Sequence, residues 1–312
     1  ESTFINSSLS LEQKQSRMQQ IAEGKYSLIF VAPERFQKPE FWECLKSRKI
    51  KLFVVDEAHC VSLWGHDFRP DYAKLQSYRE KLGGPTLLAL TATATEDVQR
   101  DIAKQFKLDL SSELILGGLE RPNLSLNIFD CYSDVEKNEK MIELLKRHDK
   151  DSGIIYFSLI QTLEAFSRFL NTQKIPYVKY HGDLPPDIRR KNQNDFIKDK
   201  AKLILATPAF GLGIDKPNIR FVTHYEIPST IEAYFQEVGR GGRDGEKAWA
   251  YFLFSEDDLS IQMQFLNWAY PDKSFIQKVY DLIQSKFDVV SIQGFDFLRE
   301  QMVFKNKKDF RV

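Results

Sequence analysis

The sequence predicts an α/β protein with two parallel sheets flanked by helices, followed by a helical extension. Short apolar runs alternate with segments of helical period along most of the chain. The runs that predict buried strands are residues 28–32, 52–55, 87–90, 153–157, 203–206, 221–225 and 248–254. Alternation of strands and helices is typical of parallel sheets with helices on both faces.

Helix start signals and a change of pattern define the remaining elements. Ser10 and Gln13 have capping-box spacing ahead of a helix of about ten residues. Thr95 precedes a predicted helix over 96–106 that has acidic residues in its first turn, where the helix dipole favours them. The strand pattern ends near residue 256, and 259–269 and 274–287 have helical period. These two segments form the predicted helical extension.

A break in the alternation divides the predicted sheets. Gly117, Gly118 and Pro122 lie close together, which is typical of a hinge. We therefore predict a first domain over 1–117, a second over 118–255 and the helical extension over 256–312. A length of 312 residues agrees with two domains. Because the chain starts at Glu1 and stops abruptly at Val312, we interpret it as cut at both ends.

Composition excludes some classes of protein and leaves others open. Lys plus Arg and Asp plus Glu each number 44, so a basic surface for nucleic acid must come from local arrangement. The cysteines Cys44, Cys60 and Cys131 are widely spaced, which fits a reducing compartment and argues against a disulfide framework or a zinc site. No apolar run approaches the ~18 residues of a membrane span.

A candidate catalytic motif follows the strand predicted over 52–55. Asp56 and Glu57 stand at its carboxyl end, where ligands bind in open parallel sheets. Asp56 could hold a magnesium ion bound to nucleotide phosphates, and Glu57 could orient or deprotonate the attacking water. A solvated acidic strand end is the plainer alternative.

An aromatic-rich segment follows this motif. Trp64, His66, Phe68 and Arg69 lie within six residues. Aromatic faces stack on unpaired bases, and an arginine supplies a phosphate contact or cation–π packing. The alternative is that the aromatic residues, Trp64 in particular, plug the hydrophobic core.

Asp56-Glu57-Ala58-His59-Cys60, followed by residues 64–70, resembles the RecQ helicases of superfamily 2. Further segments resemble helicase motifs in order along the chain. They are 32–35, 91–93 (motif III), 209–217 (motif V) and 236–245 (motif VI). The matches cover residues 25–255.

The resemblance implies two RecA-like domains, the first incomplete, with a helical extension that starts the family's C-terminal region. It implies an ATPase that uses ATP and Mg²⁺, moves 3′→5′ on single-stranded DNA and unwinds duplex DNA in repair or recombination. The implied partners are single-stranded and partly duplex DNA, with no membrane. The implied location is the bacterial cytoplasm with its nucleoid, or the eukaryotic nucleus.

The candidate site residues follow from these motifs. The catalytic candidates are Asp56, Glu57, Gln236, Arg240 and Arg243; those for the nucleotide and its magnesium are Asp56, Glu57, His59, Gly213, Asp215, Arg240 and Arg243. The DNA-binding candidates are Trp64, His66, Phe68, Arg69, Thr91, Thr93, His181 and Thr207.

Motif VI also has a physical interpretation. A helix over 230–240 would place Gln236 and Arg240 one turn apart, and the glycines after it would present Arg243. A guanidinium there could neutralise charge on a transferred phosphoryl group; solvent-facing arginines are the alternative.

Two other candidates keep their alternatives. Asp215 in motif V could bond a sugar or an arginine, or its segment could be a turn after a strand. His181 lies where the family grips the DNA backbone, and a capped loop histidine is an equal alternative.

The sequence departs from the family pattern in two respects. It contains no GxxxxGK[ST] run, whose amides and lysine hold nucleotide phosphates. We interpret this as truncation, with a natural pseudo-enzyme as the alternative. No cysteine follows Cys131, so the family's zinc-binding cysteines are missing and no zinc is expected. An RNA helicase of the same superfamily and a catalytically inactive DNA-binding module remain the rival functions.

Overall fold

A computed structural model describes residues 1–6, 9–62, 68–118, 120–211 and 214–301. The chain divides into two compact units. The first holds Glu1–Pro122 together with Thr230–Gln236, and the second holds Asn123–Ser229 together with Glu237–Val312.

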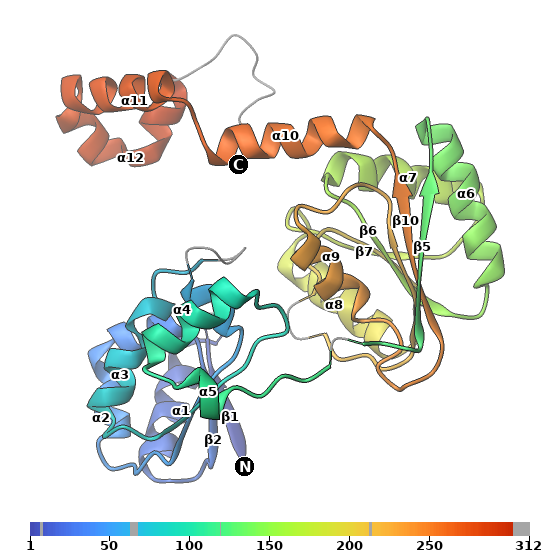
Figure 1. Ribbon diagram of the computed structural model, residues 1–312. Helices are drawn as coiled ribbons and strands as arrows, with labels where there is room; N and C mark the ends of the chain where they lie inside the picture. Colours follow the sequence, from blue (N-terminus) through green and yellow to red (C-terminus); the bar gives the residue numbers. More distant parts are fainter. Residues whose placement is uncertain (7–8, 63–67, 119, 212–213, 302–312) are drawn as a thin grey trace. The chain divides into compact units, whose positions relative to one another are not determined.

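In its described residues, the first unit contains four short strands among helices. Figure 1 shows this unit in blue and green. In chain order its elements are β1 (Ser2–Ile5), α1 (Leu11–Ala22), β2 (Leu28–Val31), the 3₁₀ helix η1 (Pro33–Gln37), α2 (Pro39–Leu45), β3 (Leu52–Val55), η2 (Ala58–Val61), η3 (Tyr72–Lys74), α3 (Leu75–Lys81), β4 (Thr86–Ala89), α4 (Glu96–Phe106) and α5 (Leu110–Glu113). β1 pairs with β2 and β3 pairs with β4, both in parallel, as the alternating pattern predicts.

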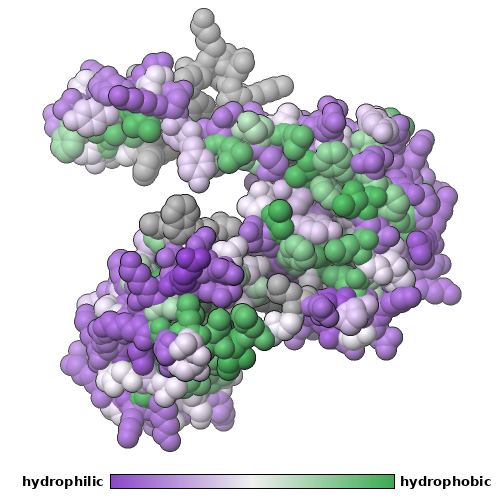
Figure 2. All heavy atoms as spheres, viewed as in Figure 1, coloured by the Kyte–Doolittle hydropathy of each residue, from purple (hydrophilic) through white to green (hydrophobic). Residues whose placement is uncertain are grey.

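One face of these strands is covered and the other is open. In β3, Phe53 and Val55 are 8% and 3% exposed, whereas Leu52 and Val54 are 51% and 45% exposed. The prediction of buried strands is therefore wrong for this unit, because a continuous apolar run does not reveal whether both faces are covered. Figure 2 shows apolar side chains at the surface of this unit.

The second unit contains one larger sheet and the helical extension (Figure 1). Its elements are β5 (Leu124–Asp130), α6 (Asp134–Arg147), β6 (Ser152–Tyr156), α7 (Ile160–Thr172), β7 (Val178–Tyr180), α8 (Pro186–Ile197), β8 (Leu203–Ala206), β9 (Ile219–His224), β10 (Ala248–Phe254), α10 (Asp257–Ala269), α11 (Lys273–Ser285) and α12 (Phe287–Gln301). Between β9 and β10 lies α9 (Ile231–Val238), whose residues up to Gln236 group with the first unit.

The larger sheet has six parallel strands in the order β5-β10-β9-β6-β8-β7. Ile155 and Leu205 pack with residues of α6 and α7, such as Leu144 and Leu163. Their neighbours along the strands, such as Ile154, pack instead with Phe196 of α8. Helices thus lie on both faces of the sheet, which confirms the predicted α/β class.

Local sequence signals are confirmed closely. The hydroxyl of Ser10 accepts from the Gln13 amide while the Gln13 side chain accepts from the Ser10 amide, which is a complete capping box. Thr95 caps α4 through the amide of Val98. The helical extension is also confirmed, with α12 as a third helix that is interrupted at Gly294. Among the described residues, no helix is both long and apolar enough to cross a membrane.

Candidate functional site

The two carboxylates of the DEAH motif stand where β3 ends. Asp56 is exposed, and one of its oxygens (Oδ1) accepts the Glu57 amide at 3.0 Å. Glu57 has φ 50° and ψ 45°, a left-handed conformation that costs a non-glycine residue about 1–3 kcal/mol. The surroundings enforce this turn, because the Ala58 amide donates to the carbonyl of Leu90 at 2.8 Å. The turn leaves both carboxylates at the carboxyl end of the strand.

His59 connects this turn to the motif that follows β4. Its ring is buried, and Nδ1 lies 3.0 Å from the hydroxyl of Thr91. That hydroxyl also donates to the Thr93 carbonyl at 3.0 Å. Because a hydroxyl has a single proton, it cannot donate to His59 at the same time. Nδ1 of His59 is therefore the donor in the His59–Thr91 bond. Nδ1 also lies 3.4 Å from Oε2 of Glu57, which favours the same tautomer.

The described flanks of the aromatic-rich segment are both attached near the DEAH turn. Trp64 and His66 lie outside the described residues. Before them, the Ser62 hydroxyl donates to Asp101 of α4 at 2.5 Å. After them, the Arg69 amide donates to the Cys60 carbonyl at 2.9 Å, and Phe68 is 38% exposed. Of these two flanking residues, Arg69 is thus bonded directly to Cys60, three residues after Glu57.

The arginines of motif VI have different surroundings within the second unit. Arg240 is buried, and its Nη1 donates to the Gly211 carbonyl at 2.5 Å. A Cβ atom at Gly211 would lie 2.4 Å from Nη2 of Arg240, so a larger residue there would push the end of the arginine side chain aside. Arg243 is exposed and contacts the Ile214 carbonyl at 3.0 Å and Asp215 at 3.4 Å. Of the alternatives for Asp215, the structure shows the contact with arginine; Gly213 lies outside the described residues.

The helix expected to carry both Gln236 and Arg240 is shorter than predicted. α9 ends at Val238, so Gln236 lies in its last turn and Arg240 lies beyond it. The Arg240 amide bonds the Glu237 carbonyl, and Gly242 has φ +59°. Glycines at 239, 241 and 242 favour an irregular loop over a helix, which explains the error.

His181 and Thr207 follow neighbouring strand ends, because Tyr180 of β7 pairs with Ala206 of β8. Both side chains are buried. Nε2 of His181 lies 3.2 Å from Oε1 of Glu164, at an ion-pair distance but without hydrogen-bond alignment. Glu164, on α7, also binds Lys179 at 2.7 Å. Sequence reasoning missed Glu164, since no local pattern connects a helix residue to a histidine 17 positions later.

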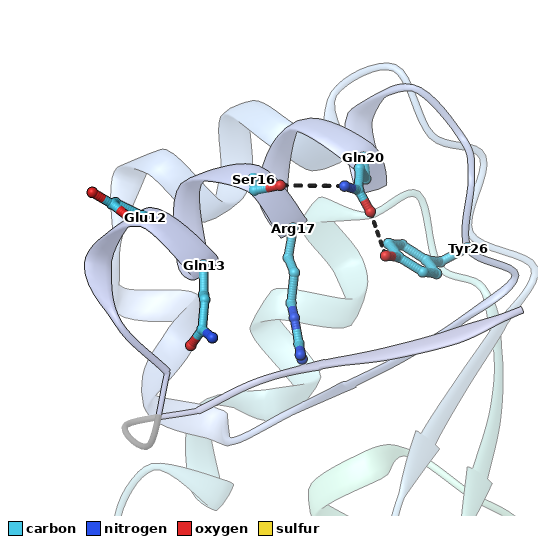
Figure 3. A pocket seen from close by; sticks show the side chains of 6 residues that line it. All are labelled: Glu12, Gln13, Ser16, Arg17, Gln20 and Tyr26. Carbon is cyan, nitrogen blue, oxygen red and sulfur yellow. Dashed lines mark hydrogen bonds between the residues drawn. The ribbon is translucent and has the colours of Figure 1, made fainter.

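A separate pocket of about 340 Å³ lies on α1 (Figure 3). Its lining residues are Glu12, Gln13, Ser16, Arg17, Gln20 and Tyr26. Several of their polar groups bond one another or the main chain: Tyr26 donates to Gln20, and Arg17 donates to the Phe4 carbonyl at 2.9 Å. No predicted site residue lines this pocket.

The carboxylate at the end of β3 suits a magnesium ion that is bound jointly by protein and nucleotide phosphates. It does not suit a metal ion that protein side chains alone would hold. In the part of the chain that the structure describes, no three His, Cys, Asp or Glu residues form a metal-binding group. Asp56 offers an exposed hard oxygen donor, and magnesium at nucleotide sites is held by one or two carboxylates together with phosphates. The residues present fit this half of a nucleotide site, whereas a GxxxxGK[ST] loop for the phosphates does not occur in the sequence.

The sequence matches known helicase families over both units. Residues 2–101 match the DEAD/DEAH box helicase family, and 136–245 match the helicase conserved C-terminal domain. The ATP-dependent DNA helicase RecQ of Bacillus subtilis is 37% identical over 83% of this chain and 43% of its own length. The probable ATP-dependent DNA helicase RecS of the same organism is 38% identical over 84% of this chain and 52% of its length. The chain thus spans about half the length of these relatives.

Comparison with solved structures supports the fold. Dbp5 of S. cerevisiae, bound to RNA and ADP BeF3, superposes with a TM-score of 0.63 at 20% identity. The match covers 87% of this chain and 68% of that one. Both units are RecA-like, and the two helicase domains occur in the order that the motifs require. The two helicase family matches, together with the RecQ and RecS relatives, show that the chain belongs to the RecQ family of DEAD/DEAH box helicases.

Proposed function

We propose that this protein couples ATP hydrolysis to 3′→5′ movement on single-stranded DNA and to unwinding of the duplex ahead. The observation that carries the proposal is the His59–Thr91 bond, which connects the carboxylate turn after β3 to the motif after β4. We expect a change at the nucleotide to reach the segment after β4 through this bond. Family membership supports ATP, Mg²⁺ and nucleic acid as ligands.

Each catalytic candidate receives a role from its surroundings. Asp56 holds the magnesium ion that accompanies the nucleotide, and Glu57 orients the attacking water. The bound ion supplies charge stabilisation for the transferred phosphoryl group. Arg243, which is exposed, neutralises charge on that group, whereas the buried Arg240 positions motif V through Gly211. His59, Gly213 and Asp215 remain candidates for binding the nucleotide, and Gln236 remains a catalytic candidate.

Recognition of DNA is assigned to the aromatic-rich segment and to the strand-end residues. Phe68, and Trp64 with it, stack on unpaired bases, while Arg69 and His66 contact phosphate. Contacts to the DNA backbone are added by Thr91, Thr93, His181 and Thr207. This segment favours DNA over RNA as the substrate, and we place the protein at the bacterial nucleoid or in the eukaryotic nucleus.

The proposal is tested on the full-length protein by measuring ATP hydrolysis with and without single-stranded DNA. Unwinding is measured on duplexes with a 3′ or a 5′ tail, and on matched RNA. Glu57→Gln should bind ATP and lose hydrolysis, and Glu96→Gln, an exposed change on α4, should behave as wild type. Hydrolysis that DNA stimulates, with unwinding only from the 3′ tail, supports the proposal. DNA binding without hydrolysis would identify a pseudo-enzyme, and a preference for RNA would identify an RNA helicase.

The 312-residue chain alone provides a second test. Because it lacks the phosphate loop sequence, it should hydrolyse ATP no faster than background. Elemental analysis of the same sample should find no stoichiometric zinc, and a chelator should leave its melting temperature unchanged. DNA-stimulated turnover by this chain, or about one zinc per chain, contradicts these two expectations.

A further inference from the structure

Asn123, the residue before β5, holds both ends of the loop that carries Arg243. Its side-chain amide donates to the carbonyls of Gly242 and Glu246, each at 2.8 Å. Its own carbonyl accepts the Ala248 amide at 2.9 Å, where the β5–β10 ladder begins. One residue, 119 positions away in sequence, thus holds residues 242–248, which we call the Arg243 loop.

The Arg243 loop fits closely around this asparagine. Gly242 has φ +59°, and a Cβ atom there would lie 2.6 Å from both the Asn123 Nδ2 and the Glu246 carbonyl oxygen. A side chain at this position would displace the amide group. The Gly242 amide donates to the Ile219 carbonyl at 2.8 Å, which attaches the same residue to β9.

A second contact holds the middle of the loop. Arg220 of β9 forms an ion pair with Asp244 and donates to the Lys247 carbonyl at 3.2 Å. Arg243 lies between Gly242, which Asn123 holds, and Asp244, which Arg220 holds. The backbone on both sides of Arg243 is therefore fixed by side chains from outside the loop.

Without these contacts the Arg243 loop would carry a large conformational entropy, because it contains Gly242 and Gly245. A catalytic group must be held close to its working geometry before substrate arrives. We propose that Asn123 is a positioning residue, which fixes the Arg243 loop so that Arg243 is presented in one orientation. This inference rests on the proposed role of Arg243 in ATP hydrolysis.

The chain offers a matched control in the same strand. Asn127 is half-buried like Asn123, and its side-chain amide also donates to main-chain carbonyls, those of Ser125 and Ala250 at 3.3 and 3.5 Å. Neither carbonyl belongs to the Arg243 loop. Asn123→Asp and Asn127→Asp make the same chemical change, from a side-chain amide to a carboxylate. The two variants differ in the carbonyl groups that lose a donor, which belong to the Arg243 loop only for Asn123.

The first measurement is hydrogen exchange in the full-length protein without nucleotide. The amides of Gly242 and Gly245 are hydrogen-bonded in the loop, to the carbonyls of Ile219 and Gly242. Asn123→Asp should speed their exchange by about tenfold or more, since the variant loses both hydrogen bonds that Asn123 donates to the loop. Exchange in β6 and β8 should stay as in wild type, and Asn127→Asp should leave the loop unchanged. Asn123→Ala serves as the second variant if Asn123→Asp does not fold.

The second measurement is steady-state ATP hydrolysis. Asn123→Asp should lower kcat by about 10- to 100-fold, as small misplacements of catalytic groups do, with little change in KM. Asn127→Asp should keep the wild-type kcat. In an Arg243→Ala background, Asn123→Asp should cause no further loss, because the group that it positions is already absent.

The outcomes separate this inference from the proposed function. Unchanged exchange in the loop overturns the inference, and so do losses of kcat that multiply in the double variant. An inactive wild type speaks against the proposed function, and the exchange measurement then still decides whether Asn123 holds the loop.

Discussion

Nδ1 of the buried His59 lies 3.0 Å from the hydroxyl of Thr91, and this hydroxyl donates a hydrogen bond to the carbonyl of Thr93. Two motifs that stand 32 positions apart are thereby joined in a chain of two hydrogen bonds. The Thr93 amide returns to the same hydroxyl at 3.2 Å. The Thr91 hydroxyl thus takes part in every bond of this network, and a variant without it tests the network.

Replacing Thr91 by valine should keep the shape and abolish this network. The buried ring nitrogen of His59 would lose its partner hydroxyl, which costs about 1–3 kcal/mol. Urea unfolding of Thr91→Val should show this loss, and Thr86→Val, an exposed change at the start of β4, should not. In the full-length enzyme Thr91→Val should also weaken DNA stimulation more than basal hydrolysis. Equal stability of the two variants would mean that the bond contributes nothing.

The two motif VI arginines should fail in different ways when replaced. Arg243→Ala should bind ATP almost normally and lose about 10³-fold in hydrolysis, as other arginine fingers do. Its unfolding midpoint should change little, since the side chain is exposed. Equilibrium nucleotide binding and single-turnover hydrolysis separate the two effects. Normal hydrolysis with weakened nucleotide binding would reassign Arg243 to ground-state binding.

Arg240→Ala should instead destabilise the second unit. The change removes a buried guanidinium and its hydrogen bond to Gly211, an interaction of about 1.5–3 kcal/mol. Urea unfolding measures the loss, with Arg243→Ala as the control. A stable Arg240→Ala protein with lost hydrolysis would make Arg240 the catalytic arginine.

Local signals were predictable from sequence because their physics is local. The Ser10–Gln13 capping box joins residues three apart, and β3 is a continuous apolar run of Leu, Phe and Val. β5 was missed because its apolar residues alternate with Ser125 and Asn127, so no continuous run marks it. The exposure of Leu52 depends on what covers the sheet and not on its own neighbours.

Residues of the candidate site were predictable from sequence only where they belong to a recognised motif. Asp56, Glu57 and Thr91 belong to recognised motifs, and the structure brings the β3 and β4 motifs together. Asn123 follows a proline in an apparent hinge, and its contact with Gly242 spans 119 positions. Chain separation of this size leaves no periodic signal in the sequence, because only the folded chain brings these two residues together.

Within the second unit, a buried ion pair connects the helical extension to α6. Nζ of Lys137 on α6 lies 2.8 Å from both carboxylate oxygens of Asp258 on α10. Lys137→Met should cost about 3–5 kcal/mol, because it leaves a buried carboxylate without its cation. Lys137→Met combined with Asp258→Leu should recover most of that loss, since a buried pair and an apolar pair are nearly equivalent.

The same helix supplies the control for this pair. Lys140 and Glu143 form an exposed pair at 2.7 Å, and Glu143→Gln should change stability by less than about 1 kcal/mol. Urea unfolding of the three variants measures each cost. A double variant as unstable as Lys137→Met alone would show that the pair is required for more than charge compensation.

The last prediction concerns Glu226, a buried carboxylate after β9. It accepts the amides of Ser158 and Leu159 at 2.7 and 3.0 Å, just before α7 begins. Burial raises its pKa above the ordinary value of 4.5, and the nearby Asp258 acts in the same direction. The folded protein therefore holds this proton more tightly than the unfolded chain does. The stability contributed by Glu226 is fully present below pH 4.5 and is lost as pH rises through the raised pKa.

Glu226→Gln should remove this pH dependence while keeping an oxygen that accepts both amides. The stability of the wild type minus that of Glu226→Gln should fall as pH rises from about 4 to 8, because ionisation then penalises only the wild type. Urea unfolding at several pH values gives this difference, in which the titrating groups that do not interact with Glu226 cancel. Glu139→Gln, an exposed change on α6, controls for the loss of one charge. A stability difference that does not change with pH would show that the amides of Ser158 and Leu159 offset the effect of burial on the carboxylate. A difference that rises with pH would show that these amides outweigh burial.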